Sequence, residues 1–267
     1  MGNKDFMKQF IKKYWKTILF FVFTGLFGGF FTGIYVLDSY PLELRNQLLS
    51  EMSNMGINEE FVPIFMGIVT GFQTGGYGLI LGIIGIYLSK KIGLWKDERK
   101  LEKKPLIVTL IFSIIGGLAI ILPDLLFFNN YSEVIANSYN NKPTLVYILA
   151  AITYGGVFEE VMLRLFTMSL VGFILFKIFD KKKEDPSTWV LVTSNIFSSL
   201  LFGIGHLPAT LQMLGDSFLI IARCIILNGG IGLLFGYLYR KYGLRYAMIA
   251  HAGCHLISKL IWILFIW

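Results

Sequence analysis

The chain has 267 residues, of which 55% are hydrophobic and only 15% are charged, and it carries a formal net charge of +7. Soluble domains contain about 25% charged residues, and several apolar runs here exceed the roughly 20 residues that cross a bilayer. The composition therefore excludes a soluble protein. The basic residues lie in short loops between apolar segments, so the positive charge does not indicate a nucleic-acid partner. We predict an all-α, polytopic membrane protein.

Seven membrane-spanning helices are predicted in chain order. They cover residues 15–37, 61–89, 105–128, 144–177, 188–210, 217–239 and 245–267. Residues 41–60 are polar with scattered Leu and Met, which favours a short helix at the membrane surface. The second and fourth spans are longer than a bilayer requires, so we expect them to tilt, kink or extend beyond it.

Basic residues are concentrated in the N-terminal flank and in every second loop after it. They are Lys4, Lys8, Lys12, Lys13, Lys16, Lys90, Lys91, Lys96, Arg99, Lys100, Lys103, Lys104, Lys177, Lys181, Lys182, Lys183, Arg240, Lys241 and Arg245. Cytoplasmic loops carry an excess of Lys and Arg. The pattern therefore predicts a cytoplasmic N-terminus and an outside C-terminus.

Glycines recur at four-residue spacing in the first two spans. The rows are Gly25, Gly29 and Gly33, then Gly67, Gly71 and Gly75. Small residues at this spacing let helix backbones approach closely. We therefore expect the two helices to pack against each other along these rows.

A few ionisable residues remain inside the spans or at their ends once the loops are set aside. They are Asp124, Glu159, Glu160, Arg164, His206, Arg223, His251, His255 and Lys259, which include all three histidines of the chain. Each buried charge costs about 2.5–3.5 kcal/mol on insertion scales, so such residues indicate a functional site by default. One histidine in a span is usually a hydrogen-bonded tether, but three beside a glutamate pair favour a site.

The spacing of charges in the fourth span separates the two glutamates. Glu160 and Arg164 are four residues apart, so they share a helix face and can form an ion pair. Glu159 is rotated about 100° away. It is the better candidate for a carboxylate that takes a proton from water beside a neutral imidazole, which is general-base catalysis.

The histidines of the last span allow two kinds of site. His251 and His255 also share a helix face, and they can donate hydrogen bonds to a developing oxyanion. Paired histidines at this spacing also bind zinc in proteases. The metal-binding alternative would use Glu159, His206, His251 and His255. We favour a site without a cofactor, with zinc as the alternative.

Three further charged residues have structural interpretations. The third helix runs outward and the sixth inward, which brings Asp124 and Arg223 to a similar depth and predicts an interhelical ion pair. Lys259, near the end of the last span, is expected to extend its ammonium group outward to the membrane surface.

Several motifs together resemble the CPBP family of intramembrane proteases, which includes type II CAAX prenyl endopeptidases, Abi proteins and bacteriocin-processing proteins. The motifs are Phe158-Glu159-Glu160-x-x-x-Arg164, Phe202-x-x-x-His206, Gly232-Leu-Leu-Phe-Gly-Tyr-Leu-Tyr-Arg240 and His251-x-x-x-His255. The resemblance covers about residues 143–260. It divides one membrane domain into an N-terminal three-helix segment, 1–142, and catalytic helices, 143–267.

The resemblance implies proteolysis within the membrane. Glu159 and His206 would activate the water, Glu160 and Arg164 would hold the site together, and His251 with His255 would stabilise the oxyanion. The chain departs from the family at His255, where Asn or sometimes Asp is usual. By helix rise, His251 lies about 10 Å from the inner boundary and the other groups lie deeper. We therefore expect the fourth and fifth helices to extend past the inner surface, with a bend near residues 203–208 as the alternative.

The predicted function is that of an endopeptidase, which hydrolyses a membrane-associated or lipidated peptide or protein. The chain is predicted to be a multi-pass protein of a prokaryotic plasma membrane. Membrane lipid is the other expected partner. Two alternatives use the same residues differently. One is a non-catalytic scaffold, immunity or regulatory protein, which would not need a titrating carboxylate in lipid. The other is a proton-coupled carrier, for which glutamate and histidine in spans are also expected.

Overall fold

The computed structural model describes residues 3–96 and 100–267, so Arg99 of the basic loop lies outside the described residues. All regular structure in these ranges is helical. The α-helices are α1 (Asn3–Ser39), α2 (Leu42–Asn54), α3 (Val62–Lys91), α4 (Lys103–Pro123), α5 (Asn129–Tyr131), α6 (Glu133–Ser138), α7 (Leu145–Ala150), α8 (Ser169–Phe179), α9 (Thr188–Gly205), α10 (Leu207–Leu214), α11 (Phe218–Tyr242) and α12 (Leu244–Ile261). A 3₁₀ turn covers Glu59–Phe61, and wider π-helical segments cover Asp124–Phe128, Ala151–Phe158, Val161–Met168 and Trp262–Ile266.

Seven helical segments in the described residues are long and apolar enough to cross a membrane. They are Met7–Ser39, Glu59–Lys91, Lys103–Tyr131, Leu145–Phe179, Thr188–Leu214, Phe218–Tyr242 and Leu244–Ile266. Each coincides with one predicted span, so the all-α, seven-span fold is confirmed. The largest difference is at the start of the first span, which begins at Met7 because the helix continues through the basic flank.

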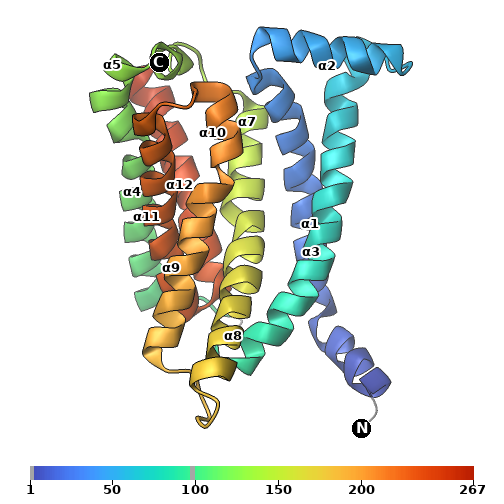
Figure 1. Ribbon diagram of the computed structural model, residues 1–267, viewed down its shortest axis with the longest axis vertical. Coiled ribbons are helices and arrows are strands. Elements are labelled where there is room, and N and C mark those ends of the chain that lie inside the picture. Colours follow the sequence, from blue (N-terminus) through green and yellow to red (C-terminus); the bar gives the residue numbers. More distant parts are fainter. Residues whose placement is uncertain (1–2, 97–99) are drawn as a thin grey trace.

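The two chain ends lie at opposite ends of the helix bundle (Figure 1). Helix α2 lies across the end opposite the N-terminus, roughly perpendicular to the long helices, and it has no buried residue. The predicted short helix in residues 41–60 is therefore present. Which end of the bundle faces the cytoplasm stays a prediction.

Helices α1 and α3 pack closely along their glycine rows. A Cβ atom added to Gly25 would lie 2.5 Å from the Thr74 carbonyl oxygen, and one added to Gly33 would lie 2.5 Å from the Met66 carbonyl oxygen. No real Cβ atom tolerates such separations, so the backbones approach as the spacing predicts. The hydroxyl of Thr74 also donates a hydrogen bond to the Gly25 carbonyl, 2.6 Å away.

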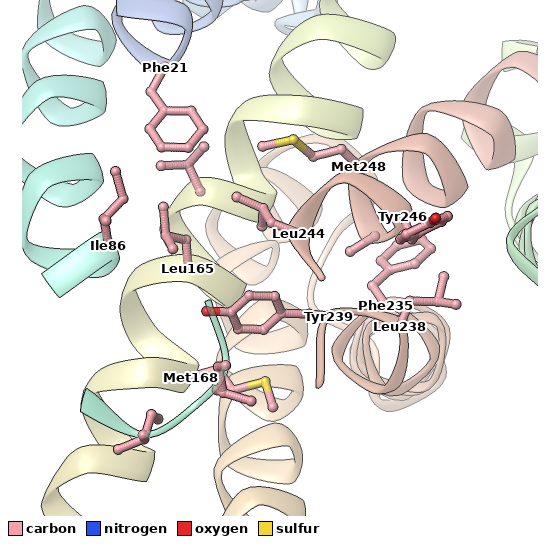
Figure 2. Packing of buried hydrophobic residues seen from close by; sticks show 14 of the residues in the cluster. Phe21, Ile86, Leu165, Met168, Phe235, Leu238, Tyr239, Leu244, Tyr246 and Met248 are labelled. Atoms are coloured by element: carbon pink, nitrogen blue, oxygen red, sulfur yellow. The ribbon is translucent and has the colours of Figure 1, made fainter. Parts of the chain in front are cut away.

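The main apolar core lies where the N-terminal helices meet the C-terminal ones (Figure 2). Phe21 of α1 and Ile86 of α3 belong to the same cluster as Leu165, Phe235 of α11 and Met248 of α12. Figure 2 shows these side chains converging from separate helices. Helices α1 and α3 are therefore packed into the same core as the helices that carry the ionisable residues. The boundary at 142/143 stays a prediction.

Two connections set the positions of the helices that carry the histidines. Helix α11 passes to α12 through Gly243 alone, whose φ of +107° lies in the region that favours glycine. The fifth span is interrupted at His206, between the end of α9 and the start of α10, and Pro208 lies in the first turn of α10. The predicted loosening of the helix near residues 203–208 is thus present. No membrane boundary is defined, so the predicted overhang of the fourth and fifth helices stays untested.

Candidate active site

The fourth span carries both glutamates in a helix that is not regular. It begins as an α-helix capped by Thr144, whose hydroxyl accepts a hydrogen bond from the Tyr147 amide at 3.1 Å. It then widens into π-helical segments on both sides of Glu159 and Glu160. Such segments are rare and are frequent at functional sites. The sequence predicts a regular α-helix here, and Gly155-Gly156 is the one visible signal for the departure from it.

Glu160, Arg164 and His251 form a sealed polar group. One Arg164 Nη atom lies 3.3 Å from Glu160 Oε1, and His251 Nδ1 lies 2.9 Å from the same oxygen. The side chains of Glu160 and Arg164 are 0% exposed. The predicted ion pair is therefore present, and the last span joins it through His251. Glu160 Oε1 is in contact with both the Arg164 guanidinium and the His251 ring. Glu160 therefore links the fourth span to the last span.

Arg164 is held from two further helices. Its second Nη atom donates a 2.8 Å hydrogen bond to the Gly232 carbonyl of α11. Its guanidinium lies 4.9 Å from the ring centre of Phe202 and 5.5 Å from that of Phe235. An arginine inside a membrane protein needs such donors and aromatic faces because lipid offers none. These contacts join α9 and α11 to the fourth span.

Glu159 faces a different partner from its neighbour. Its Oε1 atom lies 4.0 Å from His206 Nε2, and the two side chains are 13% and 37% exposed. The other ring nitrogen of His206, Nδ1, lies 2.8 Å from the Phe202 carbonyl oxygen. Because a carbonyl only accepts hydrogen bonds, Nδ1 carries a proton, and in the neutral ring Nε2 presents a lone pair toward Glu159. The pair is therefore a partly exposed carboxylate and imidazole that lie close together without a direct hydrogen bond.

Aromatic rings bring the three histidines into one cluster. The Phe202 ring lies 4.8 Å from the His206 ring and 5.5 Å from the His251 ring, measured between ring centres. His251 is stacked on Phe235 at 4.4 Å and on His255 at 5.0 Å. Phe202 and Phe235 both lie in motifs quoted from the sequence, where neither was given a role. The spacing of Phe202 one helical turn before His206 is the signal that was available.

His255 lies one turn beyond His251 and faces the fourth span. A Cβ atom added to Gly155 would lie 2.8 Å from His255 Nε2, so the missing side chain of Gly155 makes room for the imidazole. His255 Nδ1 is buried and has no hydrogen-bond partner among the described residues. A buried polar atom without a partner is costly and is a candidate for contact with a ligand or a reacting group.

A cavity of about 280 Å³ extends from His206 toward the end of the bundle that carries the C-terminus. Its polar lining includes Asp124, Tyr139, Tyr147, Arg223 and Lys259. The predicted ion pair is present here, since Arg223 donates 2.6 Å hydrogen bonds to both oxygens of Asp124. The expectation that Lys259 reaches the membrane surface is wrong. Its side chain is buried, and its ammonium group donates a 3.0 Å hydrogen bond to the Tyr147 hydroxyl.

The donors named for a metal-binding site are only partly assembled. Across residues 3–96 and 100–267, no group of three or more His, Cys, Asp or Glu side chains is arranged to hold a metal ion. Glu159 and His206 face each other, whereas His251 is bonded to Glu160. As arranged, the side chains do not fit a three-ligand zinc centre, and no step below is derived through a metal.

Comparison with known families matches this part of the chain. Residues 141–257 match the family described as "Type II CAAX prenyl endopeptidase Rce1-like". The C-terminal part of the chain is therefore similar to this family. The match begins within two residues of the predicted start of the catalytic helices and contains the glutamate pair and all three histidines. The comparisons with curated proteins and with solved structures found no match.

The family is one of CAAX-type intramembrane proteases, so the match supports a hydrolase. The resemblance noted from the motifs is thereby confirmed at the level of the family. The roles of individual residues are not part of that match. They depend on the geometry of this chain.

Proposed function

We propose that the protein is an intramembrane endopeptidase in which Glu159 and His206 activate the water that attacks the peptide bond. One observation carries the proposal. The Glu159 carboxylate and the His206 imidazole face each other at 4.0 Å, beside a cavity, inside a membrane-spanning bundle. An apolar pair at these two positions would hold the helices together at a lower cost in free energy, so a structural role does not explain this glutamate and histidine.

The 4.0 Å separation is too long for a direct hydrogen bond and suits a bridging water. A water about 2.8 Å from both atoms would donate one proton toward Glu159 and the other toward His206 Nε2. Both atoms are acceptors when the His206 ring is neutral, because its Nδ1 atom then carries the proton that is donated to the Phe202 carbonyl. Transfer of one proton to Glu159 leaves the water oxygen free to attack a carbonyl carbon, and that proton is then available to the leaving amine.

His251 and His255 are proposed to stabilise the oxyanion. Because His251 Nδ1 is bonded to Glu160, its Nε2 atom can donate to an oxyanion only when the ring is an imidazolium. The Glu160 carboxylate, which also pairs with Arg164, is in contact with that ring. His255 has an unbonded Nδ1 atom and can donate as a neutral ring. Glu160 and Arg164 act here as positioning residues.

The substrate class is proposed to be a membrane-associated or lipidated peptide or protein. The support is the position of the glutamate and histidine residues within apolar spans and the family description, which names a prenyl endopeptidase. A peptide bond can reach these residues only from a chain that enters or lies against the bilayer. We further propose that the protein resides in a prokaryotic plasma membrane and acts without a resident metal.

The test is cleavage of a library of membrane-inserting peptides by the full chain reconstituted in vesicles. Glu159→Gln should lower the cleavage rate at least about 100-fold, the smaller end of what general-base catalysis contributes. Glu184→Gln, in the exposed loop before α9, makes the same chemical change away from the site and should leave the rate unchanged. Loss of activity with a chelator as well would show that the enzyme requires a metal. No cleavage of any peptide by the wild-type chain would count against the proposal and favour a scaffold.

A further inference from the structure

The cavity beside His206 carries an excess of positive charge. Its ionised lining comprises Lys259 and Arg223 against Asp124, which leaves one uncompensated positive charge. All three residues lie within spans or at their ends. A positive charge costs several kcal/mol in this environment unless a partner neutralises it.

The carboxylate of Asp124 is held by Arg223 and Tyr139. Its Oδ1 atom accepts a hydrogen bond from Arg223 Nε, and its Oδ2 atom accepts from Arg223 Nη2 at 2.6 Å and from the Tyr139 hydroxyl at 3.0 Å. Arg223 is neutralised by this bidentate contact. The uncompensated charge therefore belongs to Lys259.

Lys259 is built into the wall of the cavity and lacks an acidic partner. The residue is 95% buried, as its relative exposure is 5%. Its ammonium group donates to the Tyr147 hydroxyl and lies 4.4 Å from the centre of the Tyr147 ring. No carboxylate of the described residues lies within ion-pair distance of it. An ammonium group has three N–H donors, so two remain available to a ligand.

Tyr147 fixes where the ammonium group is held. Its ring is stacked on Tyr35 of α1 at 4.4 Å with an angle of 14° between the ring planes, and it packs edge-on against Trp262. The hydroxyl therefore has a fixed position at the start of the fourth span. A buried cation that is held in one place by an aromatic scaffold is a prepared site for an oxyanion.

We infer that Lys259 binds a carboxylate of the peptide substrate and so orients that peptide toward Glu159 and His206. This inference rests on the proposed function. The carboxylate belongs to the substrate because one cavity is lined by both Lys259 and His206, so a group held at the lysine is part of a molecule that reaches the imidazole. His251, His255 and Lys259 also follow one face of α12 at four-residue spacing, about 6 Å per step. In an extended peptide, the carboxylate held by Lys259 would therefore lie within a few residues of the bond that is cleaved.

The cavity also sets the direction from which the peptide arrives. It is lined by residues of α10, the first turn of α7 and the C-terminal segment after α12. Figure 1 shows these elements at the end of the bundle that carries the C-terminus and α2. The carboxylate end of the substrate would therefore lie at this end, away from the basic loops.

The experiment measures binding of fluorescent hydrophobic peptides to the full chain in vesicles of zwitterionic lipid. Binding is measured in a Glu159→Gln background so that no cleavage interferes. The peptides differ only in a glutamate or a glutamine side chain, and each is made with a free C-terminal acid and as the C-terminal amide. The four peptides distinguish a side-chain carboxylate from a terminal one. Repeating the measurement with anionic lipid tests whether a negatively charged lipid headgroup occupies the site instead.

We expect one of the two carboxylates to tighten binding about tenfold or more, as a charge-assisted hydrogen bond does. The preference should disappear in Lys259→Met and persist in Lys259→Arg. Lys142→Met is the matched control, because it removes an exposed lysine at the same end of the bundle outside the cavity lining. Lys259→Gln keeps an N–H donor for Tyr147 and gives the same readout if the methionine variant does not fold.

Three results would overturn the inference. The parent chain shows no preference for a carboxylate, or the preference survives Lys259→Met, or the lysine affects only the binding of anionic lipid. These outcomes are separate from failure of the proposed function. A carboxylate preference that depends on Lys259, together with no cleavage by the wild-type chain, would leave the anchor in place and remove the protease.

Discussion

Glu159 and Glu160 are neighbours with identical side chains, and the fold gives them different surroundings. Glu160 is sealed and bonded to Arg164 and His251, whereas Glu159 is partly exposed and lies 4.0 Å from His206. The same substitution at the two positions should therefore have different consequences. One position holds the structure together, and the other is free to react.

Glu160→Gln should destabilise the protein by about 3–5 kcal/mol, because it leaves Arg164 buried without its counter-charge. Glu159→Gln should leave the unfolding temperature in detergent nearly unchanged while it abolishes cleavage. The two variants are matched controls for each other, since the chemical change is the same and the positions are adjacent. Equal loss of thermal stability in both variants would contradict this division of roles.

At the scale of elements, the contact between α1 and α3 depends on glycine at specific positions. A Cβ atom at Gly33 would meet the Met66 carbonyl oxygen, whereas one at Gly76 of α3 would meet nothing within 4 Å. Gly33→Ala should therefore separate the helices and cost about 1–3 kcal/mol, as overpacking does. Gly76→Ala should leave thermal stability in detergent unchanged or slightly higher, because alanine is the better helix former. If both variants melt alike, the close approach of the two helices does not contribute to stability.

The loop between α8 and α9 is held by one carboxylate. Asp180 accepts from Lys183 Nζ at 2.8 Å and from the Ser187 amide at 2.7 Å, and Ser187 is the residue before α9. The hydrogen bond from Lys183, followed by those from Ser187, lowers the pKa of Asp180 to about 2. The folded pKa is thus below the ordinary value of about 3.9. The stabilising contribution is present above pH 4 and is lost as the pH falls toward 2.

Amide exchange at Ser187, corrected for its intrinsic rate, measures this loop directly. Protection in the wild-type chain should fall between pH 4 and pH 2. In Asp180→Asn it should already be low at neutral pH and change little on acidification. Asp185→Asn, an exposed carboxylate in the same loop, should retain the wild-type profile. Protection that is independent of pH in the wild-type chain would show that Asp180 does not hold the loop.

At the scale of the whole molecule, long apolar runs are enough to predict seven spans, because lipid forces every backbone group in them into helical hydrogen bonds. The ion pairs Glu160–Arg164 and Asp124–Arg223 follow in the same way, because buried charges need partners. Features that depend on three-dimensional packing were not predicted. The π-helical turns around Glu159 and the stacking of Phe235 on His251 are examples. Lys259 was placed wrongly because its partner, Tyr147, is 112 residues away in sequence.

The orientation of the bundle decides from which side a substrate reaches the cavity. Helices α3, α8 and α11 end beside basic loops, and an excess of positive charge predicts that these loops are cytoplasmic. The cavity beside His206 would then extend toward the outside, because it lies at the end that carries the C-terminus.

A cysteine at Asn140, in the loop before α7, should react with a membrane-impermeant maleimide on intact cells. A cysteine at Lys182 should react only after the membrane is permeabilised. Cys224 and Cys254 are buried and need not be replaced, because neither is accessible to the reagent. The opposite labelling pattern would reverse the orientation and bring the Lys259 cavity to the cytoplasmic side.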